Sequence, residues 1–150
     1  MADNSKLVYG GDMMLFVGSG TTKQPLAFSQ SAKLSVSMKT REISSKDSGN
    51  WTEKANGKYD WNASTDGLLA FAVTGNTTSM DAIYNLFLAG TAINVVFASK
   101  TGTSPIWTVD AAKKNFSGLG VISSIDFNAG DNDTATYSIS IEGTGALSMV

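Results

Sequence analysis

The sequence predicts a mainly β domain, a β-sandwich or small barrel with one α-helix packed on its flank. Two long segments alternate apolar and polar residues, which is the pattern of strands with one buried face. One other segment, about residues 79–89, places apolar residues at helical spacing instead. Charged residues make up only 16% of the chain, and the Ser, Thr, Asn and Gly that replace them favour strands and turns over exposed helix.

The first alternating segment covers about residues 28–39. Its apolar positions share one parity: Phe28, Ala32, Leu34, Val36 and Met38. The other parity is polar: Ser29, Ser31, Lys33, Ser35, Ser37 and Lys39. A strand of about twelve residues is twice the usual length, so this strand is expected to reach beyond its neighbours.

The second alternating segment lies near the C-terminus and repeats the same design. Its apolar positions are Ala135, Tyr137, Ile139 and Ile141, and its polar positions are Thr136, Ser138, Ser140 and Glu142. Both segments therefore predict a strand with one face toward a core and one face rich in hydroxyl groups.

The predicted helix begins after Ser79 or Thr78, either of which can cap its N-terminus, and ends at Gly90. Asp81 in the first turn suits the helix dipole. The residues expected to face the protein are Met80, Ile83, Tyr84, Phe87 and Leu88. Three turns are marginal alone, so the helix must pack on the sheet.

Shorter apolar runs predict the remaining strands at 13–17, 68–73, 93–98, 106–109, 116–127 and 146–149. The run Leu68–Val73 is expected to be buried on both faces. Turn residues predict turns at Lys100–Thr103 and at 128–133. The 150 residues fit a single domain, 1–150, with an N-terminal arm at 1–12 and an extended loop at 44–60.

The extended loop is polar, punctuated by Gly and bounded by strands. It contains Lys46, Asp47, Ser48, Gly49, Trp51 and Lys58. Trp61 alternates with apolar neighbours and is expected to be packed, whereas Trp51 lies among polar residues, where contact with another protein is the preferred interpretation. The alternative is that Trp51, Trp61 and Trp107 line a sugar-binding platform.

No catalytic residues, metal ligands or cofactor site are predicted. The chain has neither His nor Cys, which removes the usual general base, thiolate catalysis and the common zinc sites. No Ser lies in a nucleophile motif, and no phosphate-binding loop is present. Asp131 and Asp133 lie in a Gly/Asn turn that lacks the ligand spacing of a calcium loop.

The charge and the apolar runs narrow the choice of partners. A net charge of −2 with scattered Lys and Arg makes tight DNA binding unexpected, while passage of DNA without retention remains compatible. Neither a signal peptide nor a membrane span is expected. The hydroxyl-rich strand faces have three interpretations: a solvated face, a sugar- or ligand-binding face, and the wall of a water-filled channel built by several subunits.

Two stretches resemble a known family. Lys46-Asp47-Ser48-Gly49-x-Trp51, followed by Gly57-Lys58-x-x-Trp61, resembles the signature region of the major tail tube proteins of long-tailed bacteriophages. The segment from Tyr137 to Gly145 resembles the C-terminal strand of that family. The order of elements, a long strand, an extended loop, a helix and a final strand, also agrees.

The resemblance implies a β-sandwich-like tail tube fold and a structural role in the virion tail, after assembly in the host cytoplasm. Six copies would form a ring whose long strands join into one barrel, and rings would stack into a tube that conducts DNA during ejection. The implied partners are further copies of the chain and the tape-measure, tail-tip and tail-terminator proteins. A carbohydrate-binding, adhesin-like β-sandwich is the alternative.

The resemblance also implies roles for individual residues. The lumen-facing set is Ser31, Lys33, Ser35 and Ser37, with Ser29 before them, and Thr136, Ser138, Ser140 and Glu142. The 44–58 part of the loop and the N-terminal arm would contact the next ring. A register slip of one residue would exchange the two faces of either strand, so the parity needs a structure.

Overall fold

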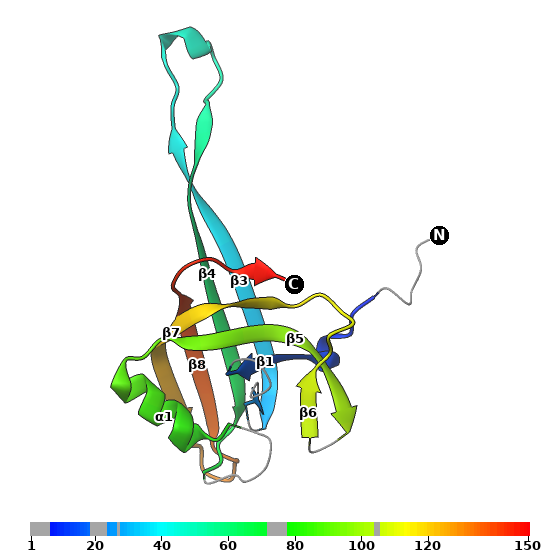
Figure 1. The fold of residues 1–150 in the computed structure, drawn as a ribbon. Helices are drawn as coiled ribbons and strands as arrows, with labels where there is room; N and C mark the ends of the chain where they lie inside the picture. Colours follow the sequence, from blue (N-terminus) through cyan, green and yellow to red (C-terminus); the bar gives the residue numbers. More distant parts are fainter. Residues whose placement is uncertain (1–6, 19–23, 27, 72–77, 104–105) are drawn as a thin grey trace.

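The computed structural model describes residues 7–18, 24–26, 28–71, 78–103 and 106–150. These residues form an antiparallel sheet of nine strands and one α-helix (Figure 1). The strands are β1 (Met13–Val17), β2 (Gln24–Pro25), β3 (Ser29–Glu42), β4 (Lys54–Leu68), β5 (Ile93–Thr103), β6 (Ile106–Val109), β7 (Phe116–Asn128), β8 (Thr136–Gly143) and β9 (Ser148–Met149). The helix α1 spans Met80–Ala89, and short 3₁₀ turns occupy Gly10–Asp12 and Lys46–Ser48.

The sheet curls around a single main core. Its strand order is β2-β1-β5-β7-β8-β4-β3, with β6 on β5 and β9 on β7. β1 and β3 lie near opposite ends of this order yet contact each other, which brings the two halves of the sheet face to face. Leu15, Trp61, Val95 and Ile139 are buried between them. The predicted mainly β, barrel-like fold is therefore confirmed.

Helix α1 covers one side of the core, as predicted, but fewer of its residues face inward. Met80 and Ile83 are buried and Leu86 packs against the core, whereas Tyr84 is 45% and Leu88 65% exposed. The expectation that Tyr84 and Leu88 pack inward was wrong, because the helix contains more apolar residues than one face can bury. Gly90 ends the helix in a left-handed conformation, as expected.

Two predicted elements differ in the structure. The run Leu68–Val73 is not a strand: β4 ends at Leu68, and Phe71 is 64% exposed, while 72–73 lie outside the described residues. The strand before it was missed because its inward positions include the small or polar residues Ala63, Thr65 and Gly67, which hide the alternation. Lys100–Thr103 is not a turn but the end of β5, where it pairs with β6.

The predicted extended loop is mostly a β-hairpin. β3 and β4 remain paired to Glu42 and Lys54 and project far beyond the body of the domain (Figure 1). Residues 54–60, including Lys58, therefore belong to β4 rather than to a loop. Only residues 43–53 form the tip, because the pairing of β3 with β4 continues to Glu42 and Lys54.

Candidate assembly surfaces

A polar face extends across β3, β4, β8 and β7. Residues paired across antiparallel strands point to the same side of a sheet. One row runs Lys33, Ser64, Ser140 and Ser124, because each residue is paired with the next. The rows beside it are Ser31, Asp66, Ser138 and Asp126, and Ser35, Asn62 and Glu142.

Eight of the nine residues expected on the lumen side lie on this face. They are Ser31, Lys33, Ser35 and Ser37 of β3 and Thr136, Ser138, Ser140 and Glu142 of β8, with β4 between the two strands. Ser29 is the exception. A register shift between Ser29 and Ser31 turns Ser29 to the other side, where its hydroxyl lies 2.9 Å from that of the buried Thr65.

Strand β4 supplies the residues that sequence reasoning missed. Its outward positions are Asp60, Asn62, Ser64 and Asp66, which fill the space between the β3 and β8 rows. The sequence signal that could have revealed this strand is an alternation along residues 60–66: Trp61, Ala63 and Thr65 are buried, and the residues between them are polar.

The polar face carries more negative than positive charge. Its residues include the carboxylates Asp60, Asp66, Asp126 and Glu142 and the cation Lys33. Ser31 donates a hydrogen bond to Asp66 over 3.1 Å, and the remaining side chains are mainly hydroxyls and amides. The face is therefore rich in hydroxyl groups and has few cations to hold a polyanion.

Both lateral edges of this four-stranded sheet are free over long stretches. In the described part of the chain, β3 pairs with β4 alone, so its other edge has no strand partner. At the opposite side, β5 and β9 pair only with residues 116–120 of β7, so 121–128 have no second strand partner among the residues that the structure describes. Long exposed edges invite pairing with another chain.

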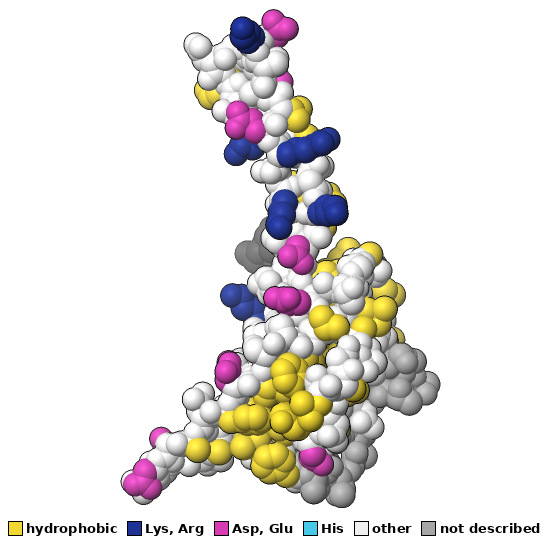
Figure 2. Space-filling model, turned by 90° about the vertical axis from the view of Figure 1, so that its left-hand side faces the viewer, with side chains coloured by type: hydrophobic (Ala, Val, Ile, Leu, Met, Phe, Trp, Pro, Cys, Tyr) yellow, Lys and Arg dark blue, Asp and Glu magenta, His cyan; other side chains and the backbone are white. Residues whose placement is uncertain are grey.

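The hairpin tip has no core, and local hydrogen bonds hold its backbone. Ile43 donates its amide hydrogen to the Glu53 carbonyl over 2.9 Å, and the Ser44 hydroxyl accepts from the Glu53 amide over 2.7 Å. Ser45 and Ser48 form a capping box around the 3₁₀ turn. Trp51, on the same tip, is 84% exposed. Figure 2 shows charged side chains along the hairpin, while hydrophobic side chains gather over the rest of the domain.

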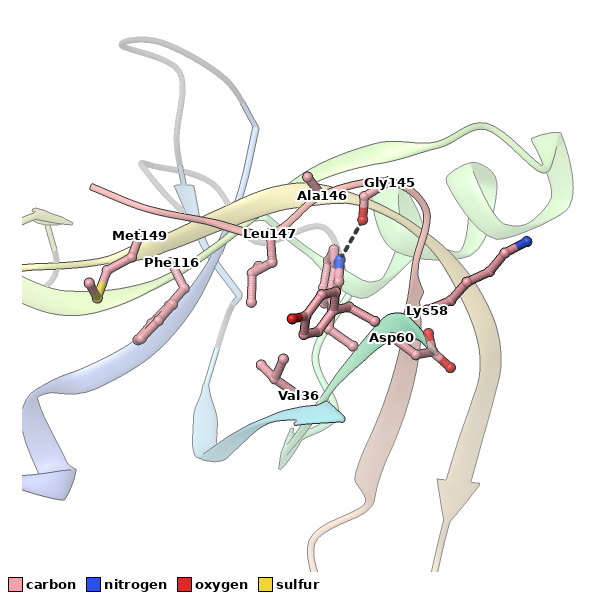
Figure 3. A pocket seen from close by; sticks show the side chains of 10 residues that line it. Val36, Lys58, Asp60, Phe116, Gly145, Ala146, Leu147 and Met149 are labelled. Carbon is pink, nitrogen blue, oxygen red and sulfur yellow. Dashed lines mark hydrogen bonds between the residues drawn. The ribbon is translucent and has the colours of Figure 1, made fainter. Parts of the chain in front are cut away.

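An apolar groove lies at the root of the hairpin. It encloses about 590 Å³ and is lined by apolar side chains from four regions: Val36 of β3, Tyr59 of β4, Phe116 of β7, and Leu147 and Met149 of the C-terminal segment. Figure 3 shows Val36 and Leu147 pointing toward each other across it, while Lys58 extends away.

Trp61 forms the inner wall of this groove and is confirmed as a packed residue, 4% exposed. Its indole N–H donates to the Gly145 carbonyl over 3.2 Å (Figure 3). Gly118 and Gly143 lie against its ring so closely that a Cβ at either would collide with it, and a Cβ at Gly120 would touch the ring tightly and collide with Ile141. The absence of a side chain at these glycines therefore leaves room for the indole ring of Trp61.

Two further findings concern the described residues. No three His, Cys, Asp or Glu side chains gather there as metal ligands would. No helix in this part of the chain combines the length and the apolar character that crossing a bilayer requires.

Comparison with solved structures finds the same fold in tube-forming particles. A chain of the native gene transfer agent virion matches with a TM-score of 0.74 and 19% identity, over 96% of this chain and 99% of that one. The SPP1 tail tube matches with a TM-score of 0.69 and 14% identity, over 95% and 78%. A sheath/tube terminator complex of the PVC extracellular contractile injection system gives 0.66 and 14%, over 99% of each chain. No match was found among curated proteins.

A curled sheet with two free edges, one polar face and a projecting hairpin defines a subunit of a larger β assembly. The sequence model of the phage tail tube protein family matches residues 8–149. The chain belongs to that family, and it is a structural subunit of a virion tail tube.

Proposed function

We propose that copies of this chain close into rings by joining their four-stranded sheets edge to edge, with the polar face inside. The observation that carries the proposal is the position of the two free edges, β3 and residues 121–128 of β7, on opposite sides of one polar-faced sheet. Closing a sheet into a barrel removes such edges.

The direction of the strands supports this joining. β7, β8, β4 and β3 alternate in direction, because each neighbouring pair is antiparallel. Copies related by rotation about a ring axis keep the same orientation along it. β3 of one copy therefore meets β7 of the next in the antiparallel sense, and the alternation continues around the ring.

The ring we propose is hexameric and stacks into a tube. The tail of the empty gene transfer agent particle, which shares this fold, was refined with C6 symmetry. The hydroxyl-rich, acidic face then lines the lumen, where DNA passes during ejection without being retained. Tape-measure, tail-tip and tail-terminator proteins are the further partners proposed, and no catalytic role is assigned to the chain.

The arrangement of the Trp residues argues against the carbohydrate-binding alternative. A sugar platform needs aromatic faces side by side. Trp61 is buried, Trp51 lies alone at the hairpin tip, and the ring of Trp107 is covered by the Lys100 ammonium at 4.3 Å.

Electron microscopy of the purified protein tests the assembly, because rings or tubes are expected at high concentration. A cysteine placed at Asn62 tests which face lines the lumen. The chain has no natural cysteine and Asn62 is exposed in the centre of the polar face. In intact tubes a small maleimide should label Asn62→Cys, while a maleimide attached to a large polyethylene glycol should not.

The unassembled variant should accept both reagents, which provides the control. Equal labelling by both reagents in intact tubes would put the polar face outside. Exclusion of both would place it in a contact between subunits. A protein that stays monomeric at high concentration would refute the ring itself.

A further inference from the structure

We propose that the groove at the root of the hairpin receives Trp51 from the hairpin tip of a copy in the neighbouring ring. This inference rests on the proposed tube and adds to it the two surfaces that join one ring to the next.

The tip is built as a preformed anchor. Trp51 is 84% exposed on a tip whose backbone is held by the Ser44–Glu53 hydrogen bonds and the Ser45–Ser48 capping box. Such bonds order a segment that buries nothing in its own domain. An exposed Trp on an ordered backbone buries a large area on docking, which is the usual make-up of an interface hot spot.

The groove is built to accept an apolar side chain. Val36 and Tyr59, which line it, are 57% and 72% exposed in the isolated chain, and Met149 is 62% exposed. A volume of about 590 Å³ lies in the range of pockets that bury most of a small ligand, so an indole fits with room for its neighbours. Exposed apolar surface of this kind marks an interaction site.

A chain cannot fill its own groove with its own Trp51. β4 begins at Lys54, so six residues of extended strand, about 20 Å, lie between the groove residue Tyr59 and the tip that carries Trp51. The hairpin can therefore bridge from one copy to the next, and its own groove stays open for another tip.

A second copy is the occupant that the geometry favours. A knob on one part of a subunit and a matching hole on another part form a heterologous contact, which repeats without closing and generates an open stack. The 3₁₀ turn near Trp51 carries one charge of each sign, Lys46 and Asp47, and so does the stretch of β4 along the groove, Lys58 and Asp60, so no excess of like charge opposes the contact.

Cross-linking between cysteines on separate chains tests the contact. Subunits with Thr52→Cys, beside Trp51, are mixed with subunits with Ala146→Cys, which lines the groove, and with an excess of unmodified chain so that tubes form. A short bis-maleimide should then produce a covalent dimer in tubes and none in the unassembled mixture. Thr52→Cys mixed with Ala129→Cys, on the β7–β8 turn, is the matched control and should give none.

The outcomes separate this inference from the proposed function. Tubes that form without the 52–146 cross-link overturn the docking and leave the tube in place. A cross-link from Val8→Cys to Ala146→Cys in its stead would assign the groove to the N-terminal arm and also overturn it. Failure of the unmodified chain to form tubes under any condition would refute the proposed function itself.

A substitution series gives a second, independent measurement. Trp51→Ala should raise the protein concentration needed for tube growth roughly tenfold or more, as expected for a buried Trp anchor. Asn50→Ala on the same tip should change it little. Equal effects of the two substitutions would contradict a Trp-centred contact.

Discussion

At the scale of single residues, the packing of Trp61 explains why the strands around it contain glycine. Its indole ring occupies space left by Gly118, Gly120 and Gly143 on two neighbouring strands. Glycine weakens a strand, and its presence at these points reflects the close approach of a side chain. The groove wall, and with it the proposed docking site, depends on this packing.

Adding one methyl group at Gly143 should therefore destabilise the fold. A Cβ there collides with the Trp61 ring, so Gly143→Ala is expected to lower the free energy of unfolding by about 1–3 kcal/mol or more. Urea denaturation of the unassembled chain measures the change. Gly11→Ala, where nothing lies within 4 Å, is the matched control and should stay within about 0.5 kcal/mol of the parent. Similar losses at both sites would show that the close contact between Gly143 and Trp61 is not the cause.

Tyr137 makes the stability of the fold sensitive to alkaline pH. Burial raises the pKa of its hydroxyl from 10.0 to about 12, with a smaller contribution from the negative charge of Asp66. The unfolded chain loses this proton near pH 10 and the folded chain only near pH 12. The contribution is therefore complete below pH 10 and disappears as the pH rises to about 12.

The free energy of unfolding should fall by roughly 2–3 kcal/mol across that interval because of this residue. Denaturation at a series of pH values measures the slope. Tyr137→Phe removes the ionisable group, so its stability should fall less steeply between pH 10 and 12 than that of the parent. Parallel curves for the two proteins would show that Tyr137 does not cause the loss.

At the scale of elements, the sequence predicted the strands whose inward residues are large. β3 and β8 were recognised because Leu34, Tyr137 and Ile139 contrast with Ser and Thr on the other parity. β4 was missed because Ala63, Thr65 and Gly67 point inward, and the helix was found while its buried face was misjudged at Tyr84 and Leu88. Pattern reasoning detects contrast between faces, and it fails where a buried face is built from small residues.

The candidate surfaces were predictable to a similar extent. Trp51 and the polar residues of β3 and β8 were identified from the sequence, and the register then placed Asp60, Asn62 and Asp66 beside them. The groove could not be predicted, because Val36, Phe116 and Leu147 come together only through pairing between distant segments.

The hairpin tip can be removed without harm to the body. Replacing residues 43–53 by Asn-Gly keeps the pairing of Glu42 with Lys54 and gives the arms a two-residue turn. No buried residue lies in the removed segment, so the free energy of unfolding is expected to change by less than about 1 kcal/mol. Circular dichroism checks the fold, and electron microscopy should show rings that do not stack. Normal tubes from this variant would mean that the tip plays no part in stacking.

At the scale of the whole molecule, the two free edges should become protected when copies assemble. Backbone amides on an unpaired edge exchange readily with solvent, and pairing with a neighbouring strand slows them. Hydrogen exchange in residues 29–42 and 121–128 should therefore slow by on the order of tenfold or more in tubes. Strand β8 is paired on both sides already and is the internal control. Slowing confined to the tip, or equal slowing in β8, would contradict the edge-to-edge joining.

The hairpin leaves the body on one side only, and this gives the subunit a direction (Figure 1). A stack of such subunits is polar: its two ends are chemically different, one with bare indole anchors and the other with empty apolar grooves. Growth by addition of subunits need not be equal at the two ends. A protein that caps the stack meets a different surface at each, so an initiating and a terminating partner would need unlike binding sites.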